Sequence, residues 1–225
     1  MKDAAAILFD FGGTLDAPGV PWKERFGRHW RAEGLDVPQE RFDRAFYDSA
    51  DSMVGTIPGE LALTGTVEEL ARRLSRNLGL AGDPRGERVA ASFLAEARAH
   101  LAASVGILRG LAPRYRLGIV SNFYGNLETV CHNTSIRSRF GVVVDSVRAG
   151  FSKPDPRIFM RALDGLGVAP RDATFVGDSA ARDMAGARAL GMRHIWLIAE
   201  PPPGEPCCPG DAMIHSLTDV EALLL

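Results

Sequence analysis

The sequence predicts an α/β fold: a doubly wound, mostly parallel, Rossmann-like sheet that carries an inserted all-helical domain. Three observations predict it. Short apolar runs are suited to buried strands, helical patterns separate these runs in the second half of the chain, and one long stretch near the N-terminus has no strand-like run. Parallel strands are covered on both faces and therefore read as near-continuous apolar runs. The 225 residues suffice for such a core and a modest second domain.

The predicted strands are the short apolar runs. They are Ala4–Phe9, Leu117–Ser121, Val142–Asp145, Thr174–Gly177, His194–Ile198 and Met213–Ile214. The helices that separate the later runs are predicted at Asn126–Thr134, Pro156–Gly165 and Ala180–Leu190. An alternation of strands and helices builds a parallel sheet through right-handed crossovers. Residues 1–16 and 105–225 are therefore assigned to the α/β core.

Residues 17–104 are predicted to form a helical cap domain. The helical patterns are Trp22–Ala32, Gln39–Asp51, Thr66–Leu78 and Arg85–Leu101. Prolines stand just before two of these helices and glycines just after two, as helix boundaries favour. A connection of this length is too long to be a loop within a compact domain. We expect the cap to close over the site on hinges near residues 18–20 and Gly106.

The composition argues against several classes of protein. Hydrophobic residues make up 46% of the chain and charged residues 24%, and the formal net charge is −2. This balance gives no electrostatic reason to expect nucleic acid or an anionic membrane as a partner. No apolar stretch approaches the ~18 residues of a membrane span, and the N-terminus lacks a signal-peptide pattern. We expect a cytoplasmic protein in which Cys131, Cys207 and Cys208 are reduced thiols, since their spacing suits neither a disulfide framework nor a zinc site.

Polar residues follow the first two predicted strands, at the edge where an open α/β sheet binds its ligands. Asp10 ends the first run and is followed by Gly12 and Gly13, which let the backbone approach a ligand closely. A carboxylate in this position can attack phosphorus and form an acyl phosphate when a cation neutralises the incoming charge. Ser121 ends the second run, where its hydroxyl can donate to a phosphoryl oxygen.

Charged residues mark the later part of the chain. Lys153 is the only lysine of the second half, and it stands before a proline and a predicted helix. Asp178 follows the fourth apolar run, and Asp183 lies five residues further on. Two carboxylates near a strand end are the oxygen ligands that Mg²⁺ prefers, together with phosphate and water.

In this order, the four segments resemble the motifs of the haloacid dehalogenase superfamily. The segments are Asp-x-x-Gly-Thr from Asp10, the strand-end Ser121, Lys153-Pro154 and Gly-Asp-Ser-x-x-x-Asp from Gly177. The helical insertion resembles the cap that this superfamily places between its first two motifs, so the resemblance covers the whole chain. It implies a hydrolase, most simply a Mg²⁺-dependent phosphatase that acts on a small phosphorylated metabolite through an aspartyl-phosphate.

The resemblance also implies three sets of functional residues. The catalytic set contains the nucleophile and the groups that orient the phosphoryl group or stabilise its developing charge: Asp10, Thr14, Ser121 and Lys153. The Mg²⁺ ligands would be the carbonyl of Gly12 and the carboxylates of Asp10, Asp178 and Asp183. The residues expected to bind substrate are Gly13, Asn122 and, from the cap, Arg25.

One position departs from the phosphatases of this superfamily. They carry a second aspartate two residues after the nucleophile, which protonates the leaving group and then activates water, and here that position is Gly12. Loss of a positioned acid–base group costs ~10²–10⁴ in rate, or about 3–5 kcal/mol of barrier. A phosphatase that is slow, or whose substrates leave without a proton, is one reading.

Three other functions stay open at this point. A carbon–halogen hydrolase needs no acid because halide leaves unprotonated, although Asp178 and Asp183 would repel a carboxylate substrate. A phosphonate-cleaving enzyme would need an imine-forming cap lysine, for which Lys23 is the sole candidate. A non-catalytic phosphate sensor or partner-binding protein needs the metal and Lys153 but no proton transfer.

Overall fold

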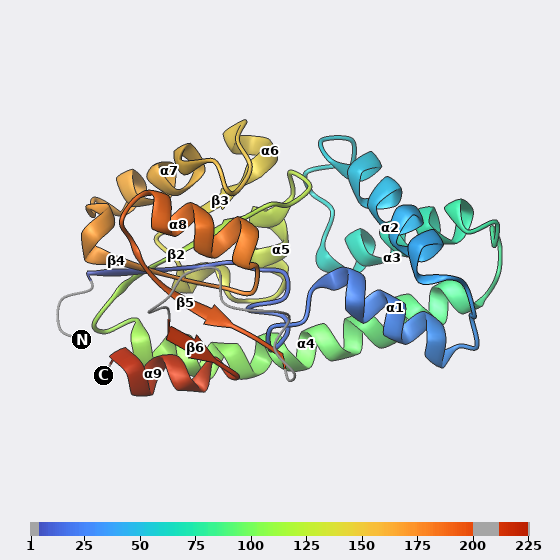
Figure 1. Ribbon diagram of the computed structural model, residues 1–225, viewed down its shortest axis with the longest axis horizontal. Coiled ribbons are helices and arrows are strands. Elements are labelled where there is room, and N and C mark those ends of the chain that lie inside the picture. The colour runs from blue at the N-terminus through green and yellow to red at the C-terminus, as the bar shows by residue number, and fades with distance from the viewer. Residues whose placement is uncertain (1–4, 200–211, 225) are drawn as a thin grey trace.

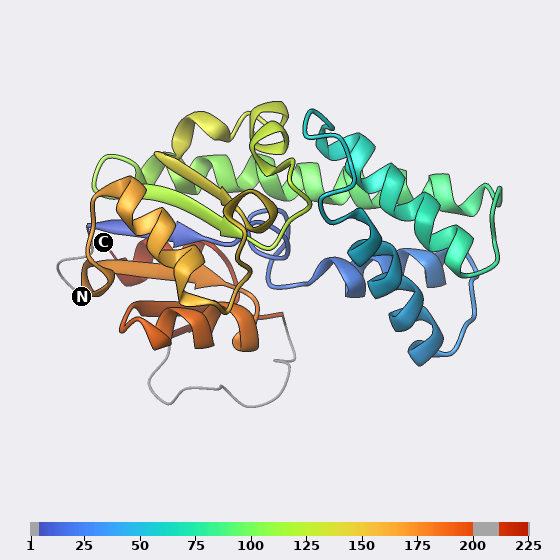
Figure 2. The same cartoon turned by 90° about the horizontal axis from the view of Figure 1, so that it is seen from above.

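The computed structural model describes residues 5–199 and 212–224, and it contains a six-stranded sheet between two layers of helices, with a helical cap at one end (Figures 1 and 2). The strands are β1 (Ala6–Phe9), β2 (Arg116–Ser121), β3 (Val142–Asp145), β4 (Ala173–Gly177), β5 (Arg193–Leu197) and β6 (Ala212–Ile214). Their order is β3-β2-β1-β4-β5-β6, and every neighbouring pair is parallel. The predicted parallel α/β sheet is confirmed.

The helices of the core cover both faces of this sheet. Side chains that alternate along β1 enter two separate apolar clusters, because neighbouring residues of a strand point to opposite faces. Ile7 and Phe9 pack with α5, α9 and the end of α4, whereas Leu8 packs with α7 and α8. The core helices are α5 (Leu127–Asn133), α6 (Ser146–Ala149), α7 (Pro156–Leu166), α8 (Ala185–Ala189) and α9 (Thr218–Leu224), with short turns η1 (Arg137–Arg139), η2 (Pro170–Asp172) and η3 (Ala180–Met184).

Between β1 and β2 the chain is helical, and residues 10–115 contain no strand. Four helices build this region: α1 (Trp22–Ala32), α2 (Gln39–Met53), α3 (Leu63–Asn77) and α4 (Arg85–Leu111). The helix α4 is longer than the sequence predicts, since it continues past Leu101 into the core. Gly106 and the expected boundary after residue 104 therefore lie inside an unbroken helix. A hinge at Gly106 would have to break that helix.

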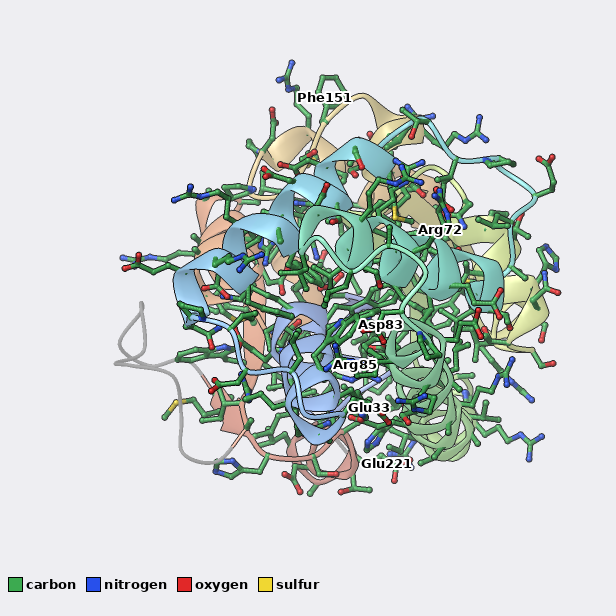
Figure 3. All side chains as sticks on the ribbon, turned by 90° about the vertical axis from the view of Figure 1, so that its right-hand side faces the viewer. Glu33, Arg72, Asp83, Arg85, Phe151 and Glu221 are labelled. Carbon is green, nitrogen blue, oxygen red and sulfur yellow. The ribbon has the colours of Figure 1, made fainter. Side chains whose placement is uncertain are left out.

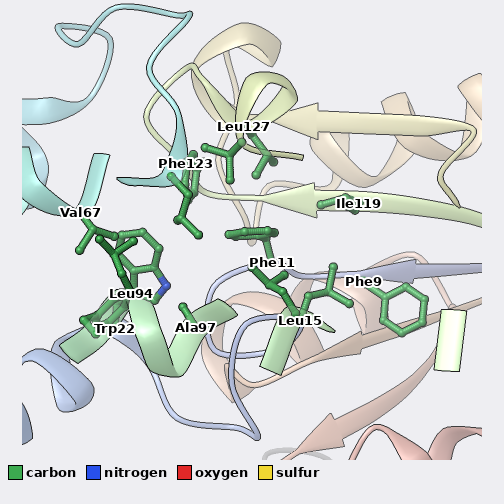
Figure 4. Packing of buried hydrophobic residues seen from close by; sticks show 14 of the residues in the cluster. Phe9, Phe11, Leu15, Trp22, Val67, Leu94, Ala97, Ile119, Phe123 and Leu127 are labelled. Carbon is green, nitrogen blue, oxygen red and sulfur yellow. The ribbon is translucent and has the colours of Figure 1, made fainter. Parts of the chain in front are cut away.

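Cap and core share one apolar interior, which Figure 4 shows from close by. Phe9 and Ile119 belong to β1 and β2, and Phe11 and Phe123 follow the ends of these strands. Trp22 continues the same apolar cluster into the cap. Polar contacts tie the two parts as well. The buried side-chain amide of Asn126 donates to the Leu61 carbonyl (2.8 Å) and to the Thr66 hydroxyl (2.7 Å) of the cap. The cap is therefore in direct contact with the segment that follows β2.

The outer end of the cap is polar. Figure 3 looks onto this end, where Glu33, Asp83 and Arg85 lie at helix termini and Arg72 lies within α3. Arg85 pairs with Asp83 at 2.7 Å. None of the helices in the described ranges has the length and apolar character needed to cross a membrane.

Of the three cysteines, only Cys131 lies within the described residues. Cys131 is buried in α5, and burial raises the pKa of its thiol to about 12, so this side chain stays a protonated, unreactive thiol. Cys207 and Cys208 lie outside the described residues, as does the start of the first predicted strand at Ala4.

Candidate active site

The candidate site lies where the strand order of the sheet reverses. β1 is flanked by β2 on one side and by β4 on the other, and open α/β sheets bind ligands in the crevice at such a switch point. Asp10 directly follows β1, and its backbone N–H donates to the Val176 carbonyl of β4 (2.9 Å). Asp178 directly follows β4. The pairing of these two strands therefore brings both carboxylates to the same edge of the sheet.

Three carboxylates and one ammonium form the centre of the site. Asp10, Asp178 and Asp183 each offer one oxygen atom, and these atoms lie within 4.8 Å of one another. The Nζ of Lys153 lies 2.7 Å from Oδ1 of Asp10 and 2.7 Å from Oδ1 of Asp183. The Asp183 side chain is fully buried, whereas that of Asp10 keeps 11% of its surface exposed. Asp10 and Lys153 both line the cavity and Asp183 does not, so Asp10 is the carboxylate of this salt-bridged trio that can meet a ligand there.

The charges of this centre do not balance. Burial, together with the charges of Asp10 and Asp183, raises the pKa of Asp178 well above its usual range. Burial also raises the pKa of Asp183, despite its ion pair. Burial alone would lower the pKa of Lys153, but the neighbouring carboxylates outweigh this effect and raise it. Three acidic groups thus face one ammonium, and this excess of hard oxygen donors fits a divalent cation such as Mg²⁺.

The loop after β1 holds Asp178 in place. Gly13 has a φ of +90°, and a Cβ there would lie 2.5 Å from Oδ2 of Asp178, so only glycine lets the loop approach this carboxylate. The Thr14 hydroxyl donates to Oδ1 of Asp178 at 3.1 Å. Asp183 lies in the π-helical turn η3 and accepts from the Ser179 backbone N–H at 3.0 Å. Gly13 and Thr14 thus contact Asp178 on the side of the loop after β1. Neither residue lines the cavity, where the sequence places Gly13 as a substrate-binding residue and Thr14 as a catalytic one.

Asn122 holds the segment that carries the lysine. Its amide nitrogen donates to the Lys153 carbonyl (3.0 Å), and its amide oxygen accepts from the Lys153 backbone N–H (2.7 Å). This reciprocal pair fixes the lysine against the end of β2. Ser121 ends β2 beside it, is 2% exposed, and lines the cavity together with Asn122.

A cavity of about 370 Å³ opens from the carboxylates toward the cap. This volume is at the small end of the range for small-molecule sites. Residues of both the core and the cap line it. Its lining includes Asp10, Gly12, Trp22, Lys23, Glu24, Phe46, Tyr47, Asp51, Val54, Ser121, Asn122, Phe123, Tyr124, Lys153, Asp178, Ser179 and Arg182.

Arg25 is not in this cavity, contrary to the expectation from the sequence. Its guanidinium is fully buried and pairs with Oδ2 of Asp16 (2.9 Å) and with Glu96 (3.1 Å). It also stacks over the Phe93 ring, 4.0 Å from the centroid. A buried cation with these partners joins α1 to the core and to α4. Its Nη2 is buried without a hydrogen-bond partner, and the side chain does not line the cavity, so it does not meet a substrate there.

Two residues that sequence reasoning missed shape the site around Gly12. The Trp22 indole N–H donates to Oδ2 of Asp16 at 2.7 Å, and the backbone N–H of Gly13 donates to Oδ1 of Asp16 at 2.7 Å. A Cβ on Gly12 would lie 3.2 Å from Nε1 of Trp22. Trp22 thus covers the place where the side chain of an acid at position 12 would begin. In the sequence, the only sign of this network is an aspartate, Asp16, two residues after Thr14.

Comparisons with known proteins agree with the fold and the motifs. The family model for haloacid dehalogenase-like hydrolases matches residues 4–191. A phosphoserine phosphatase of Thermus thermophilus is 30% identical over 98% of this chain and 82% of its own length. Haloacid dehalogenase-like hydrolase domain-containing protein 3 of Bos taurus is 45% identical over 44% of this chain, a match that covers only 39% of that relative.

A pyrimidine 5′-nucleotidase of Escherichia coli is 32% identical over 47% of this chain and 48% of its own length. Among solved structures, a dehalogenase has the same fold, with a TM-score of 0.67 at 20% identity over 100% of this chain and 98% of that one. The matched family model spans all four motifs, from the loop after β1 to the turn that carries Asp183. The chain therefore belongs to the haloacid dehalogenase-like hydrolase family.

Proposed function

We propose that this protein is a Mg²⁺-dependent phosphatase that hydrolyses a small phosphate monoester through a phosphorylated Asp10. The observation that carries the proposal is the buried cluster in which Asp10 meets Lys153, Asp178 and Asp183 and still faces the cavity. The phosphatases among the relatives support the same reaction class.

Asp10 is the nucleophile in this proposal. One of its oxygens attacks phosphorus, the bond between phosphorus and the leaving oxygen breaks, and the electron pair departs with that oxygen. Water from the cavity then attacks the phosphorus of phospho-Asp10, releases phosphate and regenerates the carboxylate. Asp10 suits this role because it is the carboxylate of the salt-bridged trio that lines the cavity.

The remaining polar groups of the site would stabilise the negative charge of the phosphoryl group and hold the metal. The Lys153 ammonium offsets the negative charge that develops on the phosphoryl oxygens, and the Ser121 hydroxyl can donate to one of them. Asp10, Asp178 and Asp183, with the carbonyl of Gly12, would hold the metal. When bound, Mg²⁺ supplies positive charge that reduces the repulsion between the nucleophile and the phosphoryl oxygens.

The cluster disfavours the halide alternative. A haloacid substrate brings its own carboxylate, which would meet three acidic side chains, Asp10, Asp178 and Asp183, beside a single ammonium. The same excess of oxygen donors suits a metal-bound phosphate. With no carboxylate at position 12 to activate water, hydrolysis of phospho-Asp10 should be the slow step and the phosphoenzyme should accumulate.

The test is phosphate release from a panel of monoesters with Mg²⁺ and with EDTA, together with acid trapping of phospho-Asp10. We expect Mg²⁺-dependent turnover and a phosphorylated peptide that contains Asp10. The Asp10→Asn variant, whose fold is checked by thermal unfolding, should show neither. A haloacid run in parallel should release no halide. Turnover that survives in Asp10→Asn, or a folded protein that forms no phosphoenzyme with any ester, would refute the proposal.

A further inference from the structure

The cavity above the carboxylates has aromatic walls. Trp22, Phe46, Tyr47, Phe123 and Tyr124 all line it, from the cap on one side and from the segment after β2 on the other. The ring of Trp22 lies 5.8 Å from that of Phe123 and 6.3 Å from that of Tyr124, while Phe46 and Tyr47 form a second pair at 6.0 Å. Aromatic rings recognise other rings through stacked and edge-to-face contacts.

Exposed apolar surface is concentrated at the same place. Among the described residues only three large hydrophobic side chains are exposed: Tyr47 (50%), Val54 (49%) and Met213 (48%). Two of the three, Tyr47 and Val54, line this cavity. Exposed apolar groups that gather around a pocket mark a ligand site, whereas scattered ones carry no meaning.

The charged residues of the cap wall argue against a second anionic group on the ligand. Lys23 is already paired with Asp43 (2.9 Å) and Glu24 (3.3 Å). Glu24 and Asp51 add negative charge to the wall. On the cap side of the cavity an uncharged ring therefore suits the surroundings better than a carboxylate or a further phosphate. On the core side, Arg182 also lines the cavity, and its Nε donates to the Ser179 hydroxyl at 3.3 Å.

Gly12 adds a chemical constraint on the leaving group. No side chain stands at position 12 to protonate the departing oxygen, and the nearby indole N–H of Trp22 is engaged by Asp16. A leaving group that is itself a stable anion needs no such help. A phenolic oxygen, with a pKa near 10 in water, meets this condition far better than an alcohol.

From these two independent features we propose that the substrate is the phosphate monoester of an aromatic hydroxyl group. The ring lies between Tyr47 and the Trp22–Tyr124 wall. The bond between Asp10 and phosphorus forms as the bond to the aryl oxygen breaks. The phenolate leaves with the electron pair and later takes its proton from water. This inference rests on the proposed phosphatase function.

Four phosphoryl donors separate the two features. Phenyl phosphate has a ring and a stable leaving anion, benzyl phosphate has only the ring, the acyl phosphate acetyl phosphate has only the stable leaving anion, and ethyl phosphate has neither. The measurement is pre-steady-state formation of phospho-Asp10 with Mg²⁺, which gives a maximal rate and a half-saturating concentration for each donor. The two donors with stable leaving anions should phosphorylate Asp10 at least about 100-fold faster than their partners. The two esters with a ring should half-saturate at about 3- to 10-fold lower concentration.

Variants of the exposed ring complete the test. Tyr47→Ala should raise the half-saturating concentration of phenyl and benzyl phosphate and leave that of acetyl and ethyl phosphate unchanged. Tyr47→Phe, which removes only the hydroxyl, should change the ring esters less than Tyr47→Ala does. Equal half-saturation for all four phosphoryl donors, or rates that do not follow the leaving group, would overturn the inference while phospho-Asp10 still forms. Failure of every donor to form phospho-Asp10 would instead overturn the proposed function.

Discussion

Restoring an acid at position 12 is the sharpest test of why this site differs from its relatives. Gly12 is not among the glycines with a positive φ, so its backbone can carry an aspartate without strain. The obstacle is Trp22, since a new Cβ would lie 3.2 Å from its Nε1 and 3.3 Å from its Cδ1. The indole cannot swing away freely, because its N–H is bonded to Asp16.

The magnitude of the Gly12→Asp effect follows from these two terms. Overpacking of this kind costs about 1–3 kcal/mol of folding stability, which lowers the Tm but leaves a protein of ordinary stability folded. A positioned general acid lowers the activation barrier by about 3–5 kcal/mol. Even if the contact with Trp22 holds the new carboxylate away from its best position, kcat/KM for ethyl phosphate should rise about tenfold or more. The gain for phenyl phosphate should be smaller, since its leaving oxygen needs less help.

The assay compares kcat/KM for both esters in the wild type, Gly12→Asp and Gly12→Ala, with thermal unfolding of each. The alanine variant makes the same contact with Trp22 without adding a carboxylate, so it measures the packing cost alone. If Gly12→Ala is folded and as active as the wild type while Gly12→Asp brings no gain on ethyl phosphate, the missing acid at position 12 does not limit the rate.

Three further predictions follow from the site and its support. Asp178→Ala should abolish the heat of Mg²⁺ binding in calorimetry, and retained binding would remove Asp178 from the metal site. Gly13→Ala should weaken Mg²⁺ binding at least about tenfold in the same titration, because its Cβ would displace Asp178; unchanged affinity would contradict this geometry. Burial alone would raise the pKa of Glu96, but Arg28 and Arg25 outweigh it and lower the pKa below its ordinary 4.5. This stabilisation is present above that pH and is lost as the pH falls through the lowered folded-state pKa, so the Tm deficit of Glu96→Gln at pH 7 should shrink below about pH 4.5, and a pH-independent deficit would contradict the assignment.

The sheet could be predicted because its strands are buried on both faces. The apolar runs give all six strands within a few residues, and the cap helix Trp22–Ala32 begins and ends where the pattern places it. The end of α4 could not be predicted. Gly106 suggests a break in the helix, although nothing in its surroundings requires a glycine, since no atom lies within 4 Å of where its Cβ would be. The helix continues through Gly106 because Leu108 and Leu111 beyond it are buried in the core. Tertiary burial here outweighs the roughly 1 kcal/mol that glycine costs within a helix.

The site was predictable where the ends of neighbouring strands bring residues together. It was not predictable where the orientation of a helix determines whether a side chain points into the cavity or into the core. Asp10 and Asp178 follow neighbouring strands, so their proximity is a consequence of the sheet order. Arg25 looked like a ligand for an anion, but its helix turns it inward onto Asp16. Charge alone does not tell which face of a helix a residue occupies. Trp22 was missed for a related reason, because an aromatic residue at a helix start usually belongs to a core.

The uninterrupted helix α4 also restricts where insertions and deletions can occur in the sequence. Its first half packs in the cap and its last turns pack against α9 in the core. One residue inserted or deleted between these halves would rotate the cap by about 100° and shift it by about 1.5 Å along the axis. Insertions and deletions should therefore be excluded from this segment and accumulate in the turns between the cap helices. A chimera that borrows a cap from a relative must cut this helix at a matching phase, or its cavity will face away from Asp10.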